Sequence, residues 1–157
     1  MKIAIGCDHA GFELKEEVRK YIAGLGHEVL DVGAFKEDPS DDYPDFAELV
    51  GNALHAKDAE RGVLICGSGV GVSVAANKMP GIRAAMCHDT YSAHQGVEHD
   101  NMNVIVFGAR IIGSALAYDL VSAYLNARFQ SNEPRFVRRL NKVNAIEAHF
   151  MSNKWDT

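Results

Sequence analysis

The residues best suited to chemistry stand together in Cys66-Gly67-Ser68-Gly69-Val70-Gly71, a glycine-rich turn that follows a short apolar run. Alternate glycines let several backbone N–H groups point inward together, and a helix that follows would add partial positive charge. Such a turn suits an anion, and the same field would favour the thiolate of Cys66. A small buried cysteine beside a structural turn is the plainer alternative. The place of the thiol, at the end of a strand and facing these donors, favours a reactive group.

The turn does not match the common glycine-rich motifs. A dinucleotide fingerprint needs G-x-G-x-x-G, but Val72 stands where the third glycine is required. A P-loop is excluded because no G-K-[ST] follows, and a nucleophile elbow, G-x-[SC]-x-G, fails for both Cys66 and Ser68. The sequence therefore predicts no nucleotide or flavin cofactor.

Asp8 and His9 follow the first apolar run of the chain, where they would face the same edge of a sheet. Asp8 is also a good N-cap for the helical segment that carries Phe12 and Leu14. His9 suits a helix start only where an anion is nearby, since imidazolium and a helix N-terminus are both positive. The pair is therefore a second candidate for contact with an anionic ligand.

Several basic residues could add charge to that ligand. Arg110 ends the fifth apolar run, while Arg135 and Arg139 are four residues apart and share one helix face. Forked guanidinium groups suit a phosphate, although a basic helix face is more often simply solvated. His99 closes a helical segment, where the helix dipole alone would stabilise its charged form.

Length and composition predict a single domain over residues 1–157, because 47% apolar residues suffice for a core at this size. A net charge of −5 argues against a nucleic-acid partner. No apolar run approaches the roughly 20 residues that span a membrane, and no signal-peptide h-region follows Met1, so a cytoplasmic protein is expected. The three cysteines lack C-x-x-C spacing, so neither disulfides nor a metal site is predicted.

The elements that must position these residues alternate along the chain. Strands are expected at 3–5, 29–32, 63–65, 83–86 and 104–107, and helices at 12–25, 43–54, 70–77, 90–99 and 114–128. A further helix is expected from 134 to about 150, followed by a tail to 157. Such alternation predicts a parallel sheet covered on both faces. With the flavodoxin-like order 2-1-3-4-5, loops 6–11 and 66–71 would meet at the ligand-binding switch point.

Five segments carry a recognisable set of motifs: Gly6-Cys7-Asp8-His9-Ala10-Gly11, Asp42-Tyr43-Pro44, Ile65-Cys66-Gly67-Ser68-Gly69-Val70-Gly71, Ala75-Ala76-Asn77-Lys78 and residues 103–110. Together they resemble the family of ribose-5-phosphate isomerase B and the galactose-6-phosphate isomerase subunits, over nearly the whole chain to about Phe150. The resemblance implies a Rossmann-like three-layer α/β/α sandwich with a five-stranded parallel sheet and an extra C-terminal helix. It also implies a homodimer, or a tetramer, with active sites shared across the subunit interface.

The resemblance implies an aldose–ketose isomerase that acts on a sugar phosphate without a cofactor or metal. Cys66 would move a proton between C2 and C1 of the open-chain sugar, and Ser68 would assist transfer between the two oxygens. The backbone N–H groups of the turn would hold the enediolate; these belong to Gly67, Gly69, Val70 and Gly71. His99 would open the sugar ring by acid–base catalysis.

The remaining roles implied by the resemblance concern binding. Asp8 and Tyr43 would bind sugar hydroxyls. The phosphate would be held by His9 with Arg135 and Arg139 of the partner subunit, and Arg110 would add charge nearby.

The residue after His99 departs from the family pattern, which commonly has Asn where this chain has Asp100. A carboxylate there would repel a phosphosugar unless a nearby arginine neutralises it or Asn101 takes over its role. His99 itself favours ribose 5-phosphate and ribulose 5-phosphate as the substrate pair. A six-carbon phosphosugar (allose 6-phosphate or galactose 6-phosphate) and a non-catalytic phosphosugar-binding protein are the alternatives.

Overall fold

The computed structural model describes residues 1–152. The strands are β1 (Lys2–Cys7), β2 (Glu28–Asp31), β3 (Arg61–Cys66), β4 (Ala84–Met86) and β5 (Val104–Gly108). The helices are the 3-10 turn η1 (His9–Gly11), α1 (Phe12–Gly24), α2 (Tyr43–His55), α3 (Val70–Ala76), α4 (Thr90–Asp100), α5 (Ser114–Asn126) and α6 (Pro134–Ser152). All the elements expected from the sequence are present. The expected tail after 150 is helical as far as Ser152, and residues 153–157 lie outside the described part.

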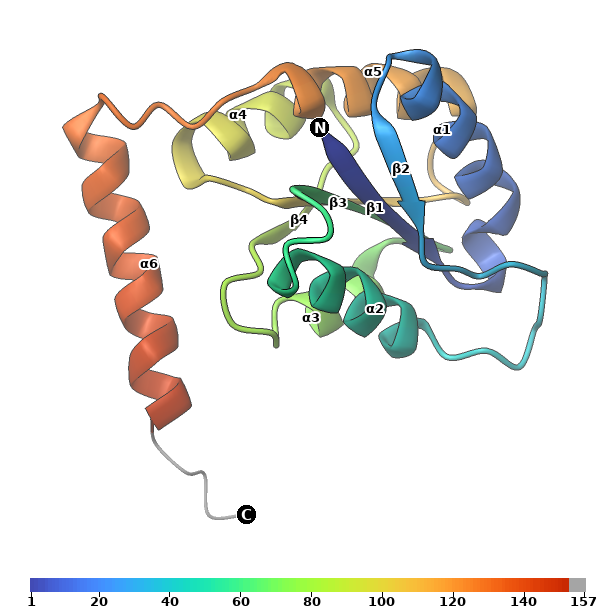
Figure 1. Ribbon diagram of the computed structural model, residues 1–157, viewed down its shortest axis with the longest axis horizontal. Coiled ribbons are helices and arrows are strands. Elements are labelled where there is room, and N and C mark those ends of the chain that lie inside the picture. Colours follow the sequence, from blue (N-terminus) through green and yellow to red (C-terminus); the bar gives the residue numbers. More distant parts are fainter. Residues whose placement is uncertain (153–157) are drawn as a thin grey trace.

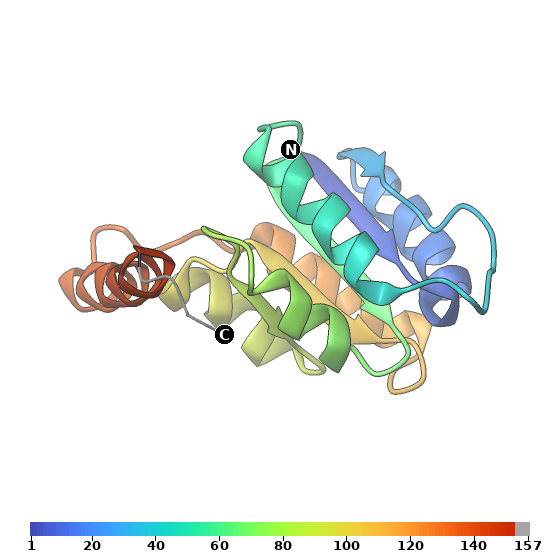
Figure 2. The same ribbon diagram turned by 90° about the horizontal axis from the view of Figure 1, so that it is seen from below.

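The five strands form one parallel sheet with helices on both faces, which confirms the predicted three-layer α/β/α sandwich (Figure 1). Along β3, Val63 and Ile65 face a core made with α1, α4 and α5. Leu64 and Cys66 face the second core, made with α2 and α3. Successive side chains of a strand point to opposite faces, so a continuous apolar run is what a doubly covered sheet requires. Figure 2 shows these layers from a second direction.

The strand order is β2-β1-β3-β5-β4, so the expected order 2-1-3-4-5 is wrong in the places of the last two strands. All five residues of β5 are buried, which fits an interior position between two neighbours. β4 has three residues and ends at Met86, whose side chain is 42% exposed, as fits a short edge strand.

This order brings the site segments closer together than the expected one. β3 pairs with β1 on one side and with β5 on the other, so Cys66 lies opposite Gly108. The loops after β1, β3 and β5 therefore meet at the C-terminal edge of the sheet. In the expected order β4 would have separated the loop after β5 from the Cys66 turn.

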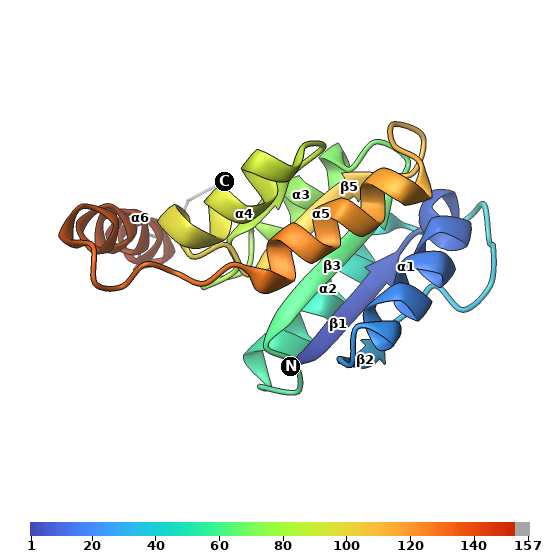
Figure 3. The same ribbon diagram turned by 90° about the horizontal axis from the view of Figure 1, so that it is seen from above.

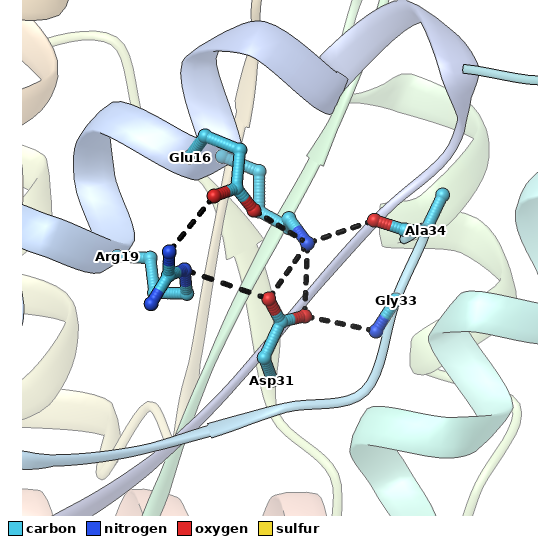
Figure 4. A network of polar contacts seen from close by, with 6 residues as sticks. Glu16, Arg19, Asp31, Gly33 and Ala34 are labelled. Carbon is cyan, nitrogen blue, oxygen red and sulfur yellow. Dashed lines mark hydrogen bonds and ion pairs between the residues drawn. The ribbon is translucent and has the colours of Figure 1, made fainter. Parts of the chain in front are cut away.

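A buried charge network fixes the segment between β2 and α2 (Figure 4). The fully buried ammonium of Lys15 donates to both carboxylate oxygens of Asp31, at 2.8 and 2.9 Å, and to the carbonyl oxygen of Ala34 at 2.8 Å. Asp31 also accepts from the backbone N–H of Gly33, and Glu16 pairs with both Lys15 and Arg19. A buried charge is tolerated only when it is paired in this way. The network anchors the start of segment 32–42, which leads to α2.

Helix α6 stands apart from the body of the molecule (Figure 1). None of its side chains is buried, and Val143, Ile146 and Phe150 are each about half exposed or more. Glu147 ties the helix to the loop before β4 by accepting from the backbone N–H of Gly81. Across residues 1–152, no helix has the length and apolar content needed to cross a membrane.

Candidate active site

A cavity of about 390 Å³ opens at the C-terminal edge of the sheet, where the loops after β1, β3 and β5 meet. It is lined by Asp8, His9, Ala10, Tyr43, Cys66, Gly67, Ser68, Gly71, Arg110 and Ile111. Eight of these ten were singled out from the sequence, and only Ala10 and Ile111 were not. The cavity is wide enough for a small phosphorylated sugar, and it places the thiol, carboxyl, imidazole and guanidinium groups around one space.

The Cys66 side chain is 5% exposed and accepts a hydrogen bond from the backbone N–H of Gly69, 3.1 Å from Sγ. Gly69 has φ +87°, in the left-handed region that glycine adopts most easily. Ser68 accepts through its hydroxyl oxygen from the backbone N–H of Val70 at 3.3 Å. The turn thus folds back on the thiol, with the backbone N–H of Gly69 directed at the sulfur.

Gly71 lets the ring of Tyr43 approach the turn. A Cβ at position 71 would lie 2.8–3.1 Å from ring atoms of Tyr43, closer than real side chains allow. Tyr43 is the first residue of α2, so this contact brings the start of α2 against the turn that carries Cys66. For Gly71, the resemblance implied only a backbone N–H that helps to hold the enediolate, and nothing in the sequence indicated that the ring of Tyr43 packs against this position.

The other two cysteines differ from Cys66 in their surroundings. Burial raises the pKa of the Cys7 thiol to about 12 and that of the Cys87 thiol to about 11. Neither lines the cavity. Both are therefore held as neutral thiols in the core.

Asp8 is 7% exposed and caps η1, because its side chain accepts from the backbone N–H of Gly11 at 3.2 Å. Asp8 therefore acts as the predicted N-cap and also lines the cavity. Burial raises the pKa of the Asp8 carboxyl, and the neighbouring His9 opposes this shift.

His9 pairs with Asp41, a residue that no motif in the sequence singled out. The two side chains meet at 2.6 Å between Nδ1 and Oδ1. The hydrogen bond to Asp41 is the main cause that raises the pKa of His9. No spacing or periodicity in the sequence links these residues, so this contact was missed.

Four sequence-predicted residues lie away from this cavity: His99, Asp100, Arg135 and Arg139. Helix α4 starts after β4 at the C-terminal edge and runs back along the sheet, so its last turn lies roughly 15 Å away, near the opposite edge. Figure 3 shows α6 beyond that end of α4, at the far side of the molecule from the β5–α5 loop.

His99 is held firmly at this second location. Its ring stacks on Phe136 of α6, with centroids 3.9 Å apart and 20° between the planes. The side-chain amide of Gln95, one helical turn earlier, lies 2.8 Å from Nδ1 of His99. Asp100 lines a groove between α4 and α6, and Arg135 and Arg139 are exposed on α6.

No three His, Cys, Asp or Glu side chains within residues 1–152 are grouped so that they could hold a metal ion. The cavity itself brings the Cys66 thiol, the Asp8 carboxyl and the His9 imidazole beside backbone donors, a set of groups suited to acid–base chemistry.

Comparisons with known proteins identify the family of the chain. A family model described as Ribose/Galactose Isomerase matches residues 3–143. Ribose-5-phosphate isomerase B of Escherichia coli (strain K12) is 42% identical over 146 residues, which cover 93% of this chain and 96% of that protein. D-erythrulose-4-phosphate isomerase of Pectobacterium atrosepticum is 41% identical, covering 83% of this chain and 86% of the relative.

Among solved structures, ribose-5-phosphate isomerase B of Clostridium thermocellum superposes with a TM-score of 0.91 at 43% identity. The match covers 96% of this chain and 99% of that one. The chain therefore belongs to the ribose/galactose isomerase family and is an isomerase.

Proposed function

We propose that the protein interconverts ribose 5-phosphate and ribulose 5-phosphate through a cis-enediolate, with Cys66 as the base. The observation that carries this proposal is the cavity that Cys66, His9 and Arg110 line together. In it, the Cys66 thiol accepts a hydrogen bond from the glycine-rich turn. The names of the relatives from Escherichia coli and Clostridium thermocellum support the choice of sugar.

The reaction needs one carbon-bound proton to move and one oxygen-bound proton to follow. The Cys66 thiolate takes the proton from C2 of the open-chain aldose and returns it to C1, while the O2 proton passes to O1 with help from Ser68. Negative charge that develops on the two oxygens is met by the N–H groups of Gly67 to Gly71. Asp8 and Tyr43 bind the sugar hydroxyls, and His9 and Arg110 bind the phosphate.

A second copy of the chain completes this site. His99, Asp100, Arg135 and Arg139 lie near the opposite edge of the sheet from Cys66, and no rearrangement within one compact domain joins the two sets. The half-exposed apolar side chains of α6 support contact with another subunit. In the resulting homodimer, His99 of the partner subunit opens the sugar ring, and Arg135 and Arg139 of the partner subunit bind the phosphate.

Mixing two inactive variants tests this arrangement. The Cys66→Ala and Arg139→Ala proteins should each be nearly inactive, and subunit exchange between them should restore about a quarter of wild-type activity. Half of the randomised dimers are mixed, and one of the two sites in each receives both intact residues. Activity is measured after exchange verified by native mass spectrometry.

The matched control combines Cys66→Ala with Asp8→Asn, which alter the same side of the cavity. Exchange then leaves a defect in every site, so no activity should return. Absence of restoration in the first mixture, despite proven exchange, would contradict the shared site.

The sugar itself is tested by comparing kcat/KM for ribose 5-phosphate, erythrulose 4-phosphate, allose 6-phosphate and galactose 6-phosphate. The four-carbon sugar is included because a relative at 41% identity is named for it. Ribose 5-phosphate should give the highest value. A higher kcat/KM for another sugar would leave the proposed isomerisation mechanism in place and change only the assigned substrate. Binding of these sugars without turnover would favour a non-catalytic sensor.

A further inference from the structure

The imidazole of His9 is held by a residue 32 positions further along the chain. Asp41 Oδ1 accepts from the backbone N–H of His9 at 3.2 Å and lies 2.6 Å from its Nδ1. The Asp41 side chain is 13% exposed and that of His9 is 30% exposed. Both contacts use the same carboxylate oxygen, so Asp41 fixes the backbone and the ring of His9 together.

The polar contacts of Asp41 indicate which charge state of His9 they suit. Asp41 Oδ2 is buried and has no hydrogen-bond partner among the described residues. The charge of this largely buried carboxylate is therefore compensated through Oδ1, where His9 is the group able to carry positive charge. A neutral His9 would leave the carboxylate without a cation, which is costly in a buried position.

Charged groups on three neighbouring segments face His9. The carboxylates of Asp41 and Asp8 favour the imidazolium, and the guanidinium of Arg110 opposes it. An adjoining cavity also places Glu13, Glu17 and Glu37 near His9 and Arg110. Together these surroundings raise the pKa of His9 and so favour the protonated ring. The hydrogen bond to Asp41 is the largest contribution to this shift.

The geometry also determines which nitrogen of His9 remains for a ligand. With Nδ1 engaged by Asp41, the nitrogen free to donate is Nε2, and His9 lines the same cavity as Cys66 and Arg110. The start of a helix disfavours a cation, so His9 needs a fixed anion to stay protonated there. Asp41 supplies that anion when the cavity is empty, and a phosphate would add a second one.

We propose that Asp41 is a positioning residue for substrate phosphate: it holds His9 as an imidazolium whose Nε2–H donates to the anion. This inference rests on the proposed function, in which His9 and Arg110 bind the phosphate. Asp41 does not itself line the cavity and acts through His9.

Segment 32–42 is built to deliver Asp41 to this place. Its start is anchored by Lys15, which binds the carbonyl oxygen of Ala34. Its end forms a turn in which Ser40 donates to the Asp38 carboxylate and the backbone N–H of Asp41 donates to the carbonyl oxygen of Asp38. Asp41 is therefore held by contacts independent of His9.

The test is Asp41→Asn, which keeps the shape and an acceptor oxygen but removes the charge. We expect KM for ribose 5-phosphate to rise about tenfold, as for a lost charge-assisted hydrogen bond, while kcat stays within about twofold. His9 would lose its proton at a lower pH in the variant. The basic limb of the kcat/KM profile should therefore move to lower pH, because anion binding fails once His9 is neutral.

Asp42→Asn is the matched control, since Asp42 is the exposed next residue of the same segment and its side chain makes no capping hydrogen bond to α2. It should leave KM and the pH profile unchanged. Equal effects of the two variants would overturn the proposal, because they would show that only the fold of the segment matters. An unchanged KM and pH profile in Asp41→Asn would overturn it as well.

Two further measurements do not depend on turnover. The titration of the His9 imidazole is followed by NMR in the wild type and in Asp41→Asn, and inorganic phosphate binding is measured for both by calorimetry. A lower His9 pKa together with weaker phosphate binding supports the proposal even if the wild type fails to isomerise ribose 5-phosphate, an outcome that overturns only the proposed substrate. An identical His9 titration in both proteins overturns the role of Asp41.

Discussion

Replacing Cys66 with alanine is expected to lower kcat for ribose 5-phosphate by about 10³-fold or more, because the variant has no group to move the proton between C2 and C1. Substrate binding should persist, with a dissociation constant within about threefold of wild type, since phosphate and hydroxyl contacts do not involve sulfur. Isomerisation is measured by coupled assay, and binding by calorimetry with the inactive variant.

Proton exchange with solvent gives a second readout for the same variant. In deuterium oxide the wild type should incorporate deuterium at the carbon that receives the proton, to the extent that the Cys66 thiol exchanges with solvent. The alanine variant should incorporate none above background, as observed by NMR of the sugar. This separates loss of the base from a general loss of affinity.

Cys87→Ala is the matched control for Cys66→Ala. Cys87 is also buried in the core, and burial raises the pKa of its thiol to about 11, so it is not poised to act as a base. Its removal should leave kcat within about twofold, the small change expected for a residue outside the reacting groups. Full activity of Cys66→Ala, with Cys87→Ala as a folded reference, would contradict the mechanism.

Cys66 could be found from the sequence because its signal is local. An apolar run, a cysteine and alternate glycines follow one another directly, and together they predict a strand end, a turn and a helix start without any long-range information. The same holds for Asp8 and His9 after the first run. Local alternation of strands and helices likewise predicted the layered α/β/α architecture, since short apolar segments were expected as strands and segments of helical period as helices.

The order of the last two strands could not be predicted in this way. β4 and β5 both read as short apolar runs, and their order depends on which of them is buried by neighbours on both sides. β5 is longer and wholly buried, whereas β4 is short and ends at the exposed Met86. This difference in burial is a property of the folded sheet. Because β5 is the strand next to β3, Arg110, which follows β5, lines the cavity beside Cys66.

Asp41 illustrates the other limit. Segment 32–42 has no periodic pattern, and its acidic residues look alike in the sequence. Asp41 is distinguished from Asp38 and Asp42 only by the path of the loop, which brings one carboxylate to His9. Contacts between loops that are far apart in the chain require the fold before they can be recognised.

The location of His99 follows from topology rather than from residue type. A helix that returns between parallel strands ends at the edge where the next strand begins, so a residue that closes α4 lies at the edge opposite to Cys66. A catalytic role for His99 was predicted by resemblance alone. In the proposed homodimer, this role falls to His99 of the partner subunit.

His99→Asn is expected to affect the two directions of the reaction differently. Ribose 5-phosphate in solution is mostly cyclic and needs a group to open the ring, so kcat/KM should fall about 10²-fold or more. Ribulose 5-phosphate has its terminal hydroxyl blocked by phosphate and cannot close a five-membered ring through it. Its initial rate of conversion to the open-chain aldose should therefore fall by less than about fivefold in the same variant.

Initial rates in each direction, with coupled removal of the product, make this comparison, and His94→Asn on the same helix is the control. His94 pairs with Glu98 rather than with α6, so its replacement should leave both directions unchanged. Equal losses in both directions for His99→Asn would assign His99 to proton transfer or binding instead of ring opening. A selective loss would show that ring opening and proton transfer use separate groups. In the proposed dimer these groups come from different subunits, so each site would depend on two chains for two consecutive steps.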